Sequence, residues 1–252
     1  MAPHIAFKNV ERRFGEKAVL RGANLEVAKG DIQVILGGSG SGKSVLLKCL
    51  LGLIGINGGD IQVNGQSVVG LNEHDHMALM GQFGMLFQNG ALFDSLSVWE
   101  NVAFRLLQDN MARADAEKIA LQKLSMVGLA SRTAHQKPSE LSGGMRKRVA
   151  LARAICHNPQ IILYDEPTTG LDPITADVIN DLIIKLQREL KCTSIVITHD
   201  MHSAFKVADR MAFLYQGTFM VEGTAKEFTK SDNPYVRQFV EGRADGPIGT
   251  TL

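Results

Sequence analysis

Residues 37 to 44 read Gly-Gly-Ser-Gly-Ser-Gly-Lys-Ser, a spacing that can hold the phosphates of a nucleoside triphosphate. Glycines at these positions allow consecutive backbone N–H groups to turn inward on a phosphate chain. We expect the Lys43 ammonium to reach the β- and γ-phosphates and the Ser44 hydroxyl to bind Mg²⁺. The whole loop is therefore a candidate ATP site: Gly37, Gly38, Ser39, Gly40, Ser41, Gly42, Lys43 and Ser44.

Two carboxylates lie at the end of a second apolar run. Residues 161–164 are typical of a buried strand, and Asp165 and Glu166 follow directly. Asp165 can hold the Mg²⁺ shell, and Glu166 can polarise a water molecule for in-line attack on the γ-phosphate. A structural acid pair at a strand end is the alternative to this hypothesis.

Gln88 and His199 are two further candidates, because each follows an apolar, strand-like run. Gln88 is a second candidate ligand for Mg²⁺ and water, and an ordinary strand-end amide is the alternative. His199 is predicted to face the same sheet edge as the phosphate loop. A surface histidine, or a core histidine with a hydrogen-bond partner, is the alternative.

A second glycine-rich helix start, Ser142-Gly143-Gly144, stands between Leu141 and Met145 and precedes a basic helix predicted over 146–156. Such a start is another anion-binding helix N-terminus. Two such starts, about a hundred residues apart, favour a dimer in which each nucleotide is held by both copies. ATP would then join the copies and hydrolysis would release them. A glycine-bearing cap without a special role is the alternative.

The elements that must position these residues alternate along the chain. A strand at 32–36 and a helix at 44–54 flank the phosphate loop, and the helix dipole favours an anion there. The sequence also predicts antiparallel strands within 5–29 with a turn at Gly15-Glu16, a strand at 61–63 with a turn at Asn64-Gly65, and further strands at 161–164, 194–198 and 211–215. Helices are predicted over 98–158 and at 174–190. Their buried faces consist of Ala116, Ile119, Ala120, Leu124 and Val127 in the first region, and of Ile179, Leu182, Ile183, Leu186 and Leu190 in the second. The pattern predicts an α/β sheet domain with an inserted helical block.

Composition sets modest bounds. The chain has 252 residues and a net charge of +1, so charge gives no case for nucleic acid as a partner. Its three cysteines lack CxxC spacing and suit a reducing cytosol. No signal-peptide core precedes residue 15, and the longest apolar run, 45–56, contains Lys48 and is shorter than a membrane span. If the protein serves a membrane, we expect other chains to span it.

Together these motifs resemble the nucleotide-binding subunit of ABC transporters, from about residue 5 to residue 246. The resemblance implies a P-loop NTPase (RecA-like) core with an antiparallel β subdomain and an inserted helical subdomain. The implied boundaries are approximately 30–88 and 158–216 for the core, 5–29 and 60–70 for the β subdomain, 89–157 for the helical subdomain, and 217–252 for C-terminal strands and an extension that contacts a partner subunit.

The resemblance also implies a role for each motif. Glu166, His199, Gln88 and Lys43 would be catalytic, and Ser44, Gln88 and Asp165 would bind Mg²⁺. The corresponding names are Walker A for 37–44, Walker B for 161–166, Q-loop for Gln88, signature for 141–145, D-loop for Leu171-Asp172, switch histidine for His199, and adenine-stacking aromatic for Phe14. Met145 departs from the glutamine usual in the signature.

Three segments resemble the Mla-type phospholipid transport ATPases: Pro138 to Met145, Met85 to Phe93, and Val236 to Ile248. This resemblance implies ATP and Mg²⁺ as cofactors, a homodimer under a membrane permease dimer, an Mce-domain lipid-binding protein and a small STAS-domain protein as partners, and a place on the cytoplasmic face of the inner membrane. The C-terminal extension would contact the neighbouring ATPase, although a disordered tail is the alternative. Residues 89–104 would seat a permease helix, with plain hydrophobic core as the alternative.

Three other functions fit parts of the pattern. The ATPase can serve an importer or exporter of another substrate, such as an amino acid, a metal or a drug. A non-transport ABC protein of DNA repair or translation usually carries a long insertion or a second cassette, and neither is found in the sequence. A scaffold with a degenerate ATPase is disfavoured by intact Lys43, Glu166 and His199.

Overall fold

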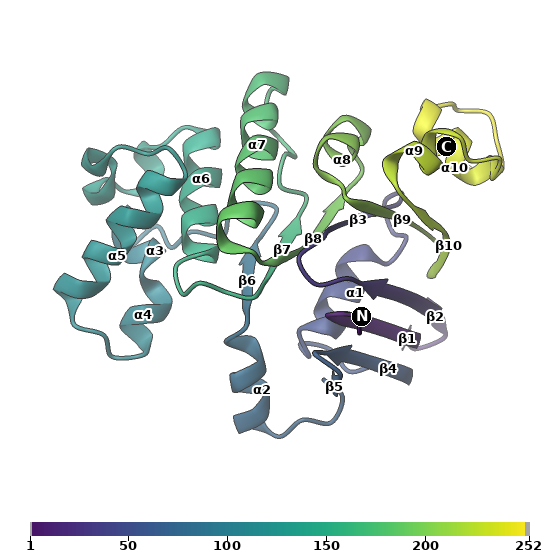
Figure 1. Cartoon of the computed structure of the whole chain (residues 1–252), viewed down its shortest axis with the longest axis horizontal. Coiled ribbons are helices and arrows are strands. Elements are labelled where there is room, and N and C mark those ends of the chain that lie inside the picture. The colour runs from purple at the N-terminus through teal and green to yellow at the C-terminus, as the bar shows by residue number, and fades with distance from the viewer. Residues whose placement is uncertain (1, 250–252) are drawn as a thin grey trace. The chain divides into compact units, whose positions relative to one another are not determined.

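The computed structural model describes residues 2–249, and Figure 1 labels its helices and strands. The chain divides into two compact units. The first unit is built from residues 1–80 and 197–252, and the second from residues 81–196. Phe14, the phosphate loop and His199 belong to the first unit. Gln88, Asp165, Glu166, the signature and Asp172 belong to the second.

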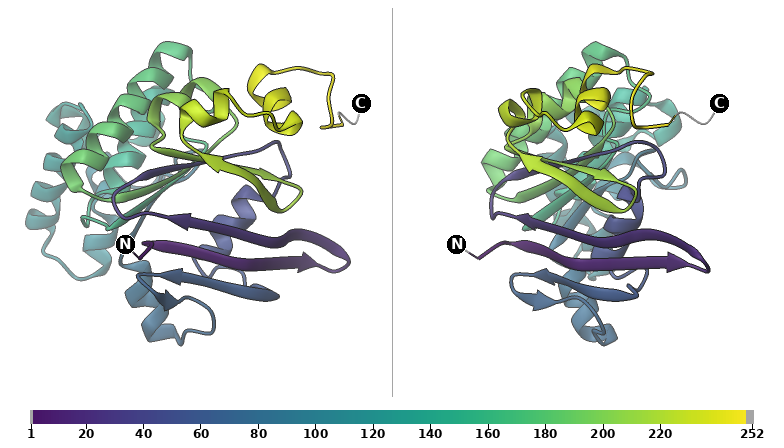
Figure 2. Two further views of the ribbon diagram at one scale, coloured as in Figure 1. Left: turned by 45° about the vertical axis from the view of Figure 1, so that its right-hand side comes forward. Right: turned by 90° about the vertical axis from the view of Figure 1, so that its right-hand side faces the viewer.

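The first unit contains a four-stranded antiparallel sheet, seen as the long purple hairpin and its blue neighbours in Figure 2. The predicted turns at Gly15-Glu16 and Asn64-Gly65 are confirmed, and Asn64 and Gly65 adopt φ angles of 52° and 78°. The strands, in sheet order, are β2 (Lys17–Val27), β1 (Ile5–Phe14), β4 (Gly58–Val63) and β5 (Gln66–Ser67).

The same unit holds the strand that precedes the phosphate loop. β3 (Ile32–Leu36) is buried at every residue, as a strand covered on both faces must be, and it pairs in parallel with β9 (Arg210–Tyr215). β9 pairs in antiparallel fashion with β10 (Thr218–Gly223). Asp209 fixes where β3 begins, because its carboxylate accepts the Ile32 N–H at 2.8 Å.

The helix after the phosphate loop, α1 (Lys43–Leu50), is shorter than the predicted 44–54. Gly52 adopts a left-handed φ of 65°, its N–H donates to the Cys49 carbonyl, and the Leu53 N–H donates to the Lys48 carbonyl. This pair of hydrogen bonds ends a helix at a glycine. The apolar residues after Gly52 therefore lie outside α1, although the sequence pattern predicts that they continue the helix.

The second unit combines two parallel strands with a helical block. β6 (Phe83–Leu86) pairs with β7 (Ile161–Asp165), and β8 (Thr193–Thr198) follows β7 in the sheet order and crosses the boundary of the units along the chain. The helices are α3 (Val98–Val102), α4 (Phe104–Gln108), α5 (Arg113–Met126), α6 (Gly143–Ala154) and α7 (Pro173–Leu190), with short 3-10 turns at Ser131–His135 and Pro138–Glu140.

The predicted apolar faces of two helices are confirmed. In α5 and the residue that follows it, Ala116, Ala120, Leu124 and Val127 are fully buried and Ile119 is half-buried. In α7 the buried residues are Ile179, Leu182, Ile183 and Leu186, whereas Leu190, at the helix end, is half-buried.

Residues 217–249 differ from the expected C-terminal strands. Within them the structure describes one strand, β10, followed by α9 (Ala225–Thr229) and α10 (Pro234–Glu241). Thr224 caps α9 together with Glu227, and Asn233 caps α10 ahead of a proline, so both helices begin with strong local signals. The sequence analysis also missed α2 (Glu73–Met80) and α8 (Met201–Val207).

The chain after α10 folds back onto the side chain of Gln238, which is 6% exposed. The Gln238 Nε2 donates to the carbonyls of Arg243, Ala244 and Ile248 at 3.3, 3.3 and 3.1 Å. Its Oε1 accepts the Ile248 N–H at 2.7 Å. Residues 243–248 thus form an ordered loop. Among the described residues 2–249, no helix is long and apolar enough to cross a membrane.

Gly84 in β6 has no room for a side chain, because a Cβ atom there would overlap the Ala154 carbonyl and lie 3.0 Å from Pro159 Cγ. We expect Gly84→Ala to lower the free energy of unfolding by about 3 kcal/mol. Denaturant titration of the purified protein measures it. Gly55→Ala is the control, since its Cβ would have no neighbour within 4 Å; equal stability of the two variants would contradict the packing argument.

Glu100 stabilises the start of α3. Hydrogen bonds from Ser97 and from Arg113 lower the Glu100 pKa to about 2. Because this folded-state pKa lies below the unfolded value of 4.5, the stabilisation is complete above about pH 5 and is lost as the pH falls towards 2. Since Glu100 is partly solvent-exposed, we expect Glu100→Gln to cost about 1 kcal/mol at pH 7. Denaturant titrations of wild type and Glu100→Gln should show a smaller difference in the free energy of unfolding at pH 3 than at pH 7. An equal difference at both pH values would contradict the stabilising role of the Glu100 carboxylate.

Candidate functional site

The phosphate loop is held tightly between β3 and α1. A Cβ atom at Gly37 would overlap the Leu214 carbonyl of β9 and lie 2.6 Å from Ser41 Oγ. Gly40 and Gly42 adopt φ angles of 75° and 109°, in the left-handed region that glycine favours. The glycine spacing seen in the sequence therefore has two causes, close backbone packing at the start of the loop and positive φ angles farther along it.

Lys43 lies folded over this loop. Its side chain is buried, and the Nζ atom donates to the carbonyls of Gly37 and Gly38 at 2.6 and 2.9 Å. No side chain caps the N-terminal amides of α1, and Ser44 in its first turn is exposed. Uncapped amides at a helix start and an adjacent ammonium are the donors that bind a phosphate chain, so the loop suits a triphosphate.

His199 and Phe14 are the other predicted site residues of the first unit. His199 is exposed and directly follows β8, and the next residue, Asp200, caps α8. Phe14 ends β1 with its side chain partly exposed, and the Arg12 guanidinium carbon lies 4.5 Å from its ring centroid. One face of the Phe14 ring therefore already carries a cation–π contact.

Asp165 and Glu166 stand at the end of β7, as predicted. Glu166 adopts a left-handed φ of 50°, which is a strained conformation for a residue with a side chain. Its carboxylate accepts the Thr169 hydroxyl at 3.0 Å, and its carbonyl accepts the Lys147 ammonium at 3.3 Å. The orientation of the Glu166 side chain therefore depends on contacts that keep its backbone in the left-handed conformation.

Lys147 of α6 is a residue that the sequence analysis missed. Its side chain is 6% exposed, and its Nζ donates to the main-chain carbonyls of Gln88 and Glu166. Burial lowers the Lys147 pKa, whereas the charges of Glu166 and Asp165 raise it. A signal was present in the sequence, because Lys147 shares the buried face of α6 with Ala150, Leu151 and Ala154.

The signature begins α6 earlier than predicted. Ser142 is the N-cap, its Oγ accepts the Met145 N–H at 3.3 Å, and Gly143 and Gly144 form the first turn. The predicted Ser-Gly-Gly helix start is confirmed, whereas the basic helix predicted over 146–156 begins three residues earlier, because glycine is tolerated in a capped first turn. A Cβ at Gly144 would lie 2.6 Å from Thr175 Cγ2, so α7 also requires glycine at this position.

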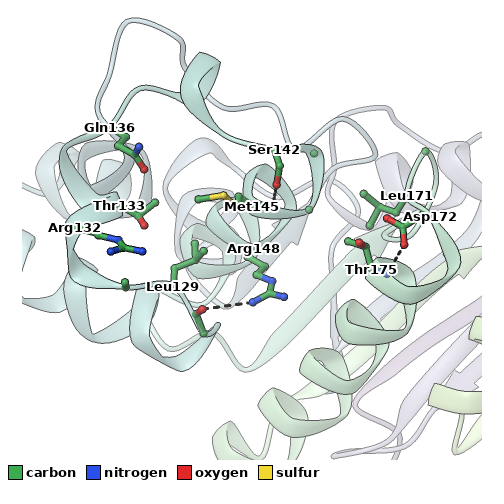
Figure 3. Close-up of a pocket in the computed structure, with 15 residues that line it drawn as sticks. Leu129, Arg132, Thr133, Gln136, Ser142, Met145, Arg148, Leu171, Asp172 and Thr175 are labelled. Carbon is green, nitrogen blue, oxygen red and sulfur yellow. Dashed lines mark hydrogen bonds between the residues drawn. The ribbon is translucent and has the colours of Figure 1, made fainter.

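A cavity of about 830 Å³ joins the signature to the D-loop within the second unit (Figure 3). Ser142, at the start of α6, and Asp172, at the start of α7, both line it. Asp172 caps α7 by accepting the Thr175 N–H at 2.9 Å, and hydrogen bonds from the side chain and backbone of Thr175 lower its pKa. The first turns of α6 and α7, with their capping residues Ser142 and Asp172, face this cavity, and a helix N-terminus favours an anion.

The structure thus gathers Gln88, Asp165 and Glu166 around α6 and places the signature beside the D-loop. The candidate metal ligands are the Ser44 hydroxyl, the Gln88 side-chain amide and the Asp165 carboxylate. All three provide hard oxygen atoms, which are the ligands that Mg²⁺ prefers. The donor set therefore suits Mg²⁺ accompanied by phosphate oxygens.

Comparison with known proteins agrees with this set of motifs. Residues 20–169 match the family described as "ABC transporter". The chain is 34% identical to a solved dimeric structure of the ATP-binding cassette MJ0796 in a post-hydrolysis state bound to ADP and Pi, with a TM-score of 0.79 and coverage of 88% of this chain and 98% of that one. The chain therefore belongs to the ABC transporter family, as an ATP-hydrolysing cassette of the P-loop fold.

Two relatives that are also named as ATP-binding proteins of transport systems cover nearly the whole chain. The chain is 40% identical to the intermembrane phospholipid transport system ATP-binding protein MlaF of Haemophilus influenzae, over 97% of this chain and 92% of the relative. It is 37% identical to the probable ribonucleotide transport ATP-binding protein mkl of Mycobacterium leprae, over 99% of this chain and 72% of the relative. The predicted resemblance to Mla-type ATPases is confirmed.

Proposed function

We propose that this chain is the ATP-hydrolysing subunit of a complex that moves phospholipid between the inner and outer membranes. The observation that carries the proposal is the 40% identity to MlaF of Haemophilus influenzae across 92% of that protein. The similarity therefore includes the region after residue 169, where the ABC family match ends. The ATPase motifs account for ATP hydrolysis, and this extended similarity to MlaF supports phospholipid as the transported molecule.

In the proposed reaction, Lys43 and the loop amides hold the β- and γ-phosphates and spread their charge. Glu166 orients the attacking water, and His199 contacts the γ-phosphate. Ser44, Gln88 and Asp165 would hold Mg²⁺, which neutralises phosphate charge when bound. Phe14 would stack on adenine, on the ring face opposite Arg12.

We also propose that two copies bind ATP together. The signature residues Ser142, Gly143 and Gly144 of one copy would complete the phosphate site of the other, with Asp172 beside them. The cavity shared by the signature and the D-loop supports this arrangement, because Ser142, Gly143 and Gly144 at the α6 N-terminus line it, and a helix N-terminus favours an anion. The dimeric MJ0796 cassette agrees with it.

The proposed partners are a membrane permease dimer, an Mce-domain lipid-binding protein and a small STAS-domain protein, on the cytoplasmic face of the inner membrane. An apolar cavity of about 400 Å³ in the second unit supports the permease contact at 89–104. Phe87, Phe93 and Phe104 line this cavity, and so do Arg105 and Arg153. The ordered loop over Gln238 supports a defined C-terminal contact surface rather than a disordered tail.

Ribonucleotide transport is the second candidate, because the mycobacterial relative carries that name and is 37% identical. The phospholipid function is favoured, since the match covers 92% of MlaF and 72% of the mycobacterial protein. An importer or exporter of an amino acid, a metal or a drug stays an alternative, because a nucleotide-binding cassette carries no pocket for the cargo.

The decisive experiment is purification of the tagged chain with its membrane partners, followed by reconstitution in phospholipid vesicles. We expect ATP-dependent transfer of fluorescent phospholipid, which is lost in the matched complex carrying Glu166→Gln. Mass spectrometry of the complex should find an Mce-domain protein. Transport of labelled ribonucleotide without lipid transfer would replace the proposal by the second candidate, and recovery of a solute-binding protein would favour a small-solute importer.

A further inference from the structure

We propose that Lys147 is a positioning residue that fixes the Gln88 segment and the backbone of Glu166 to one another, so that the hydrolytic geometry depends on where the Gln88 segment lies. This inference rests on the proposed ATPase function. It adds a residue of the signature helix that acts through two main-chain carbonyls, those of Gln88 and Glu166.

The first step is the attachment of the Gln88 segment to α6. Lys147 donates to the Gln88 carbonyl, and Arg153 donates to the carbonyls of Gly90 and Ala91 at 2.7 and 2.6 Å. Two cations of a single helix therefore hold three carbonyls of a segment that has neither helix nor strand structure. Ala91 adopts a left-handed φ of 47°, which a residue with a side chain disfavours, so these bonds hold the segment in a conformation that Ala91 would not otherwise adopt.

The second step is the attachment of Glu166 to the same ammonium. Lys147 Nζ donates to the Glu166 carbonyl at 3.3 Å, at a residue whose φ of 50° is strained. A residue persists in this region only when its surroundings hold it there. Thr169 holds the carboxylate and Lys147 holds the carbonyl, so each end of Glu166 has its own partner.

The third step is the cost of separating the two carbonyls. The Lys147 side chain is 6% exposed, and a buried ammonium that loses a hydrogen-bond partner cannot replace it readily with water. A displacement of the Gln88 segment therefore pulls on Lys147, and through it on Glu166. The two segments are 78 positions apart in the sequence, from Gln88 to Glu166, and this ammonium joins them directly.

The chain offers a matched control in Lys123 of α5. Its side chain is 7% exposed, and its Nζ donates to the Asn158 side chain at 2.6 Å. Lys123 is thus a lysine of similar burial in the same unit, bonded to a residue outside the proposed catalytic set. Replacing either lysine with methionine removes one buried ammonium, so a general loss of stability should affect both variants.

The experiment compares wild type, Lys147→Met, Lys147→Arg and Lys123→Met in the assembled transporter. We expect Lys147→Met to lower kcat for ATP hydrolysis at least tenfold while the KM for ATP changes less than threefold. Lys147→Arg keeps the charge and the donors, so it should restore at least half of the wild-type kcat. Lys123→Met should retain kcat within twofold. Hydrogen exchange should quicken at residues 166–170 in Lys147→Met and not in Lys123→Met.

A Lys147→Met kcat within twofold of wild type would overturn the proposal, as would an equal loss in Lys123→Met. If Lys147→Met does not fold by circular dichroism, Lys147→Leu, which also removes every donor, is judged by the same kcat and KM criteria. Absence of ATP hydrolysis in the wild type would instead refute the proposed function, so the two failures are distinct.

Discussion

Glu166→Gln is expected to reduce steady-state ATP hydrolysis about 1,000-fold while leaving ATP affinity within threefold of wild type. A general base typically contributes 10² to 10⁴ to a rate, and glutamine cannot accept the proton of the attacking water. Its side-chain oxygen can still accept the Thr169 hydroxyl, so the loop at the end of β7 should keep its shape. Phosphate release at saturating ATP and Mg²⁺ measures the loss.

The same variant should accumulate as an ATP-bound dimer, because the nucleotide that joins the copies is no longer consumed. Size-exclusion chromatography with and without ATP tests this point. Glu189→Gln is the matched control, since Glu189 lies partly exposed on α7 opposite Lys185. Wild-type turnover in Glu166→Gln would assign the base elsewhere. A Glu166→Gln protein that stays monomeric at saturating ATP, even with its membrane partner, would reject the dimer.

Lys43→Ala has the second large expected effect, a loss of ATP affinity of about 100-fold. Hydrogen bonds to charged groups contribute roughly 1.5–3 kcal/mol each, and removal of one such donor from a phosphate site is enough for this change. In the structure the Lys43 ammonium already lies on the Gly37 and Gly38 carbonyls, at the mouth of the loop. Isothermal titration with ATP measures the affinity.

Lys48→Ala provides the control for Lys43→Ala. Lys48 is exposed on the same helix, so its removal changes the net charge equally without touching the loop. We expect Lys48→Ala to bind ATP within twofold of wild type. Equal affinities in the two variants would show that Lys43 acts through long-range charge rather than by contact. Thermal melting without nucleotide checks that the Lys43→Ala loop has not unfolded.

Several elements could be predicted from the sequence because their signals are local. The run 32–36 is apolar at nearly every position and forms β3 with those bounds. Asn64-Gly65 forms the expected turn, since both residues tolerate positive φ. The helix after the phosphate loop was predicted to run too far because apolar residues continue past Gly52, although that glycine is itself a helix-ending signal.

Other features were beyond the sequence, for a physical reason. The burial of Lys147 could be predicted from its place on α6, but its partners could not, because every residue has a main-chain carbonyl and no side chain at 88 or 166 marks the contact. The left-handed backbone of Glu166 is likewise invisible, because glutamate has no preference for it. By contrast, α9 could have been found, since Thr224 and Glu227 have the spacing of a capping box.

The loop held by Gln238 limits how the C-terminal region can be dissected. A deletion that begins at Arg243 would remove every backbone partner of this amide, and a buried amide without partners destabilises the helix that carries it. If partner binding were lost after such a truncation, damage to α10 and loss of the contact surface would be equally good explanations. Charge reversal at the exposed Asp245 keeps the amide satisfied, and so separates recognition by a neighbour from integrity of the subunit itself.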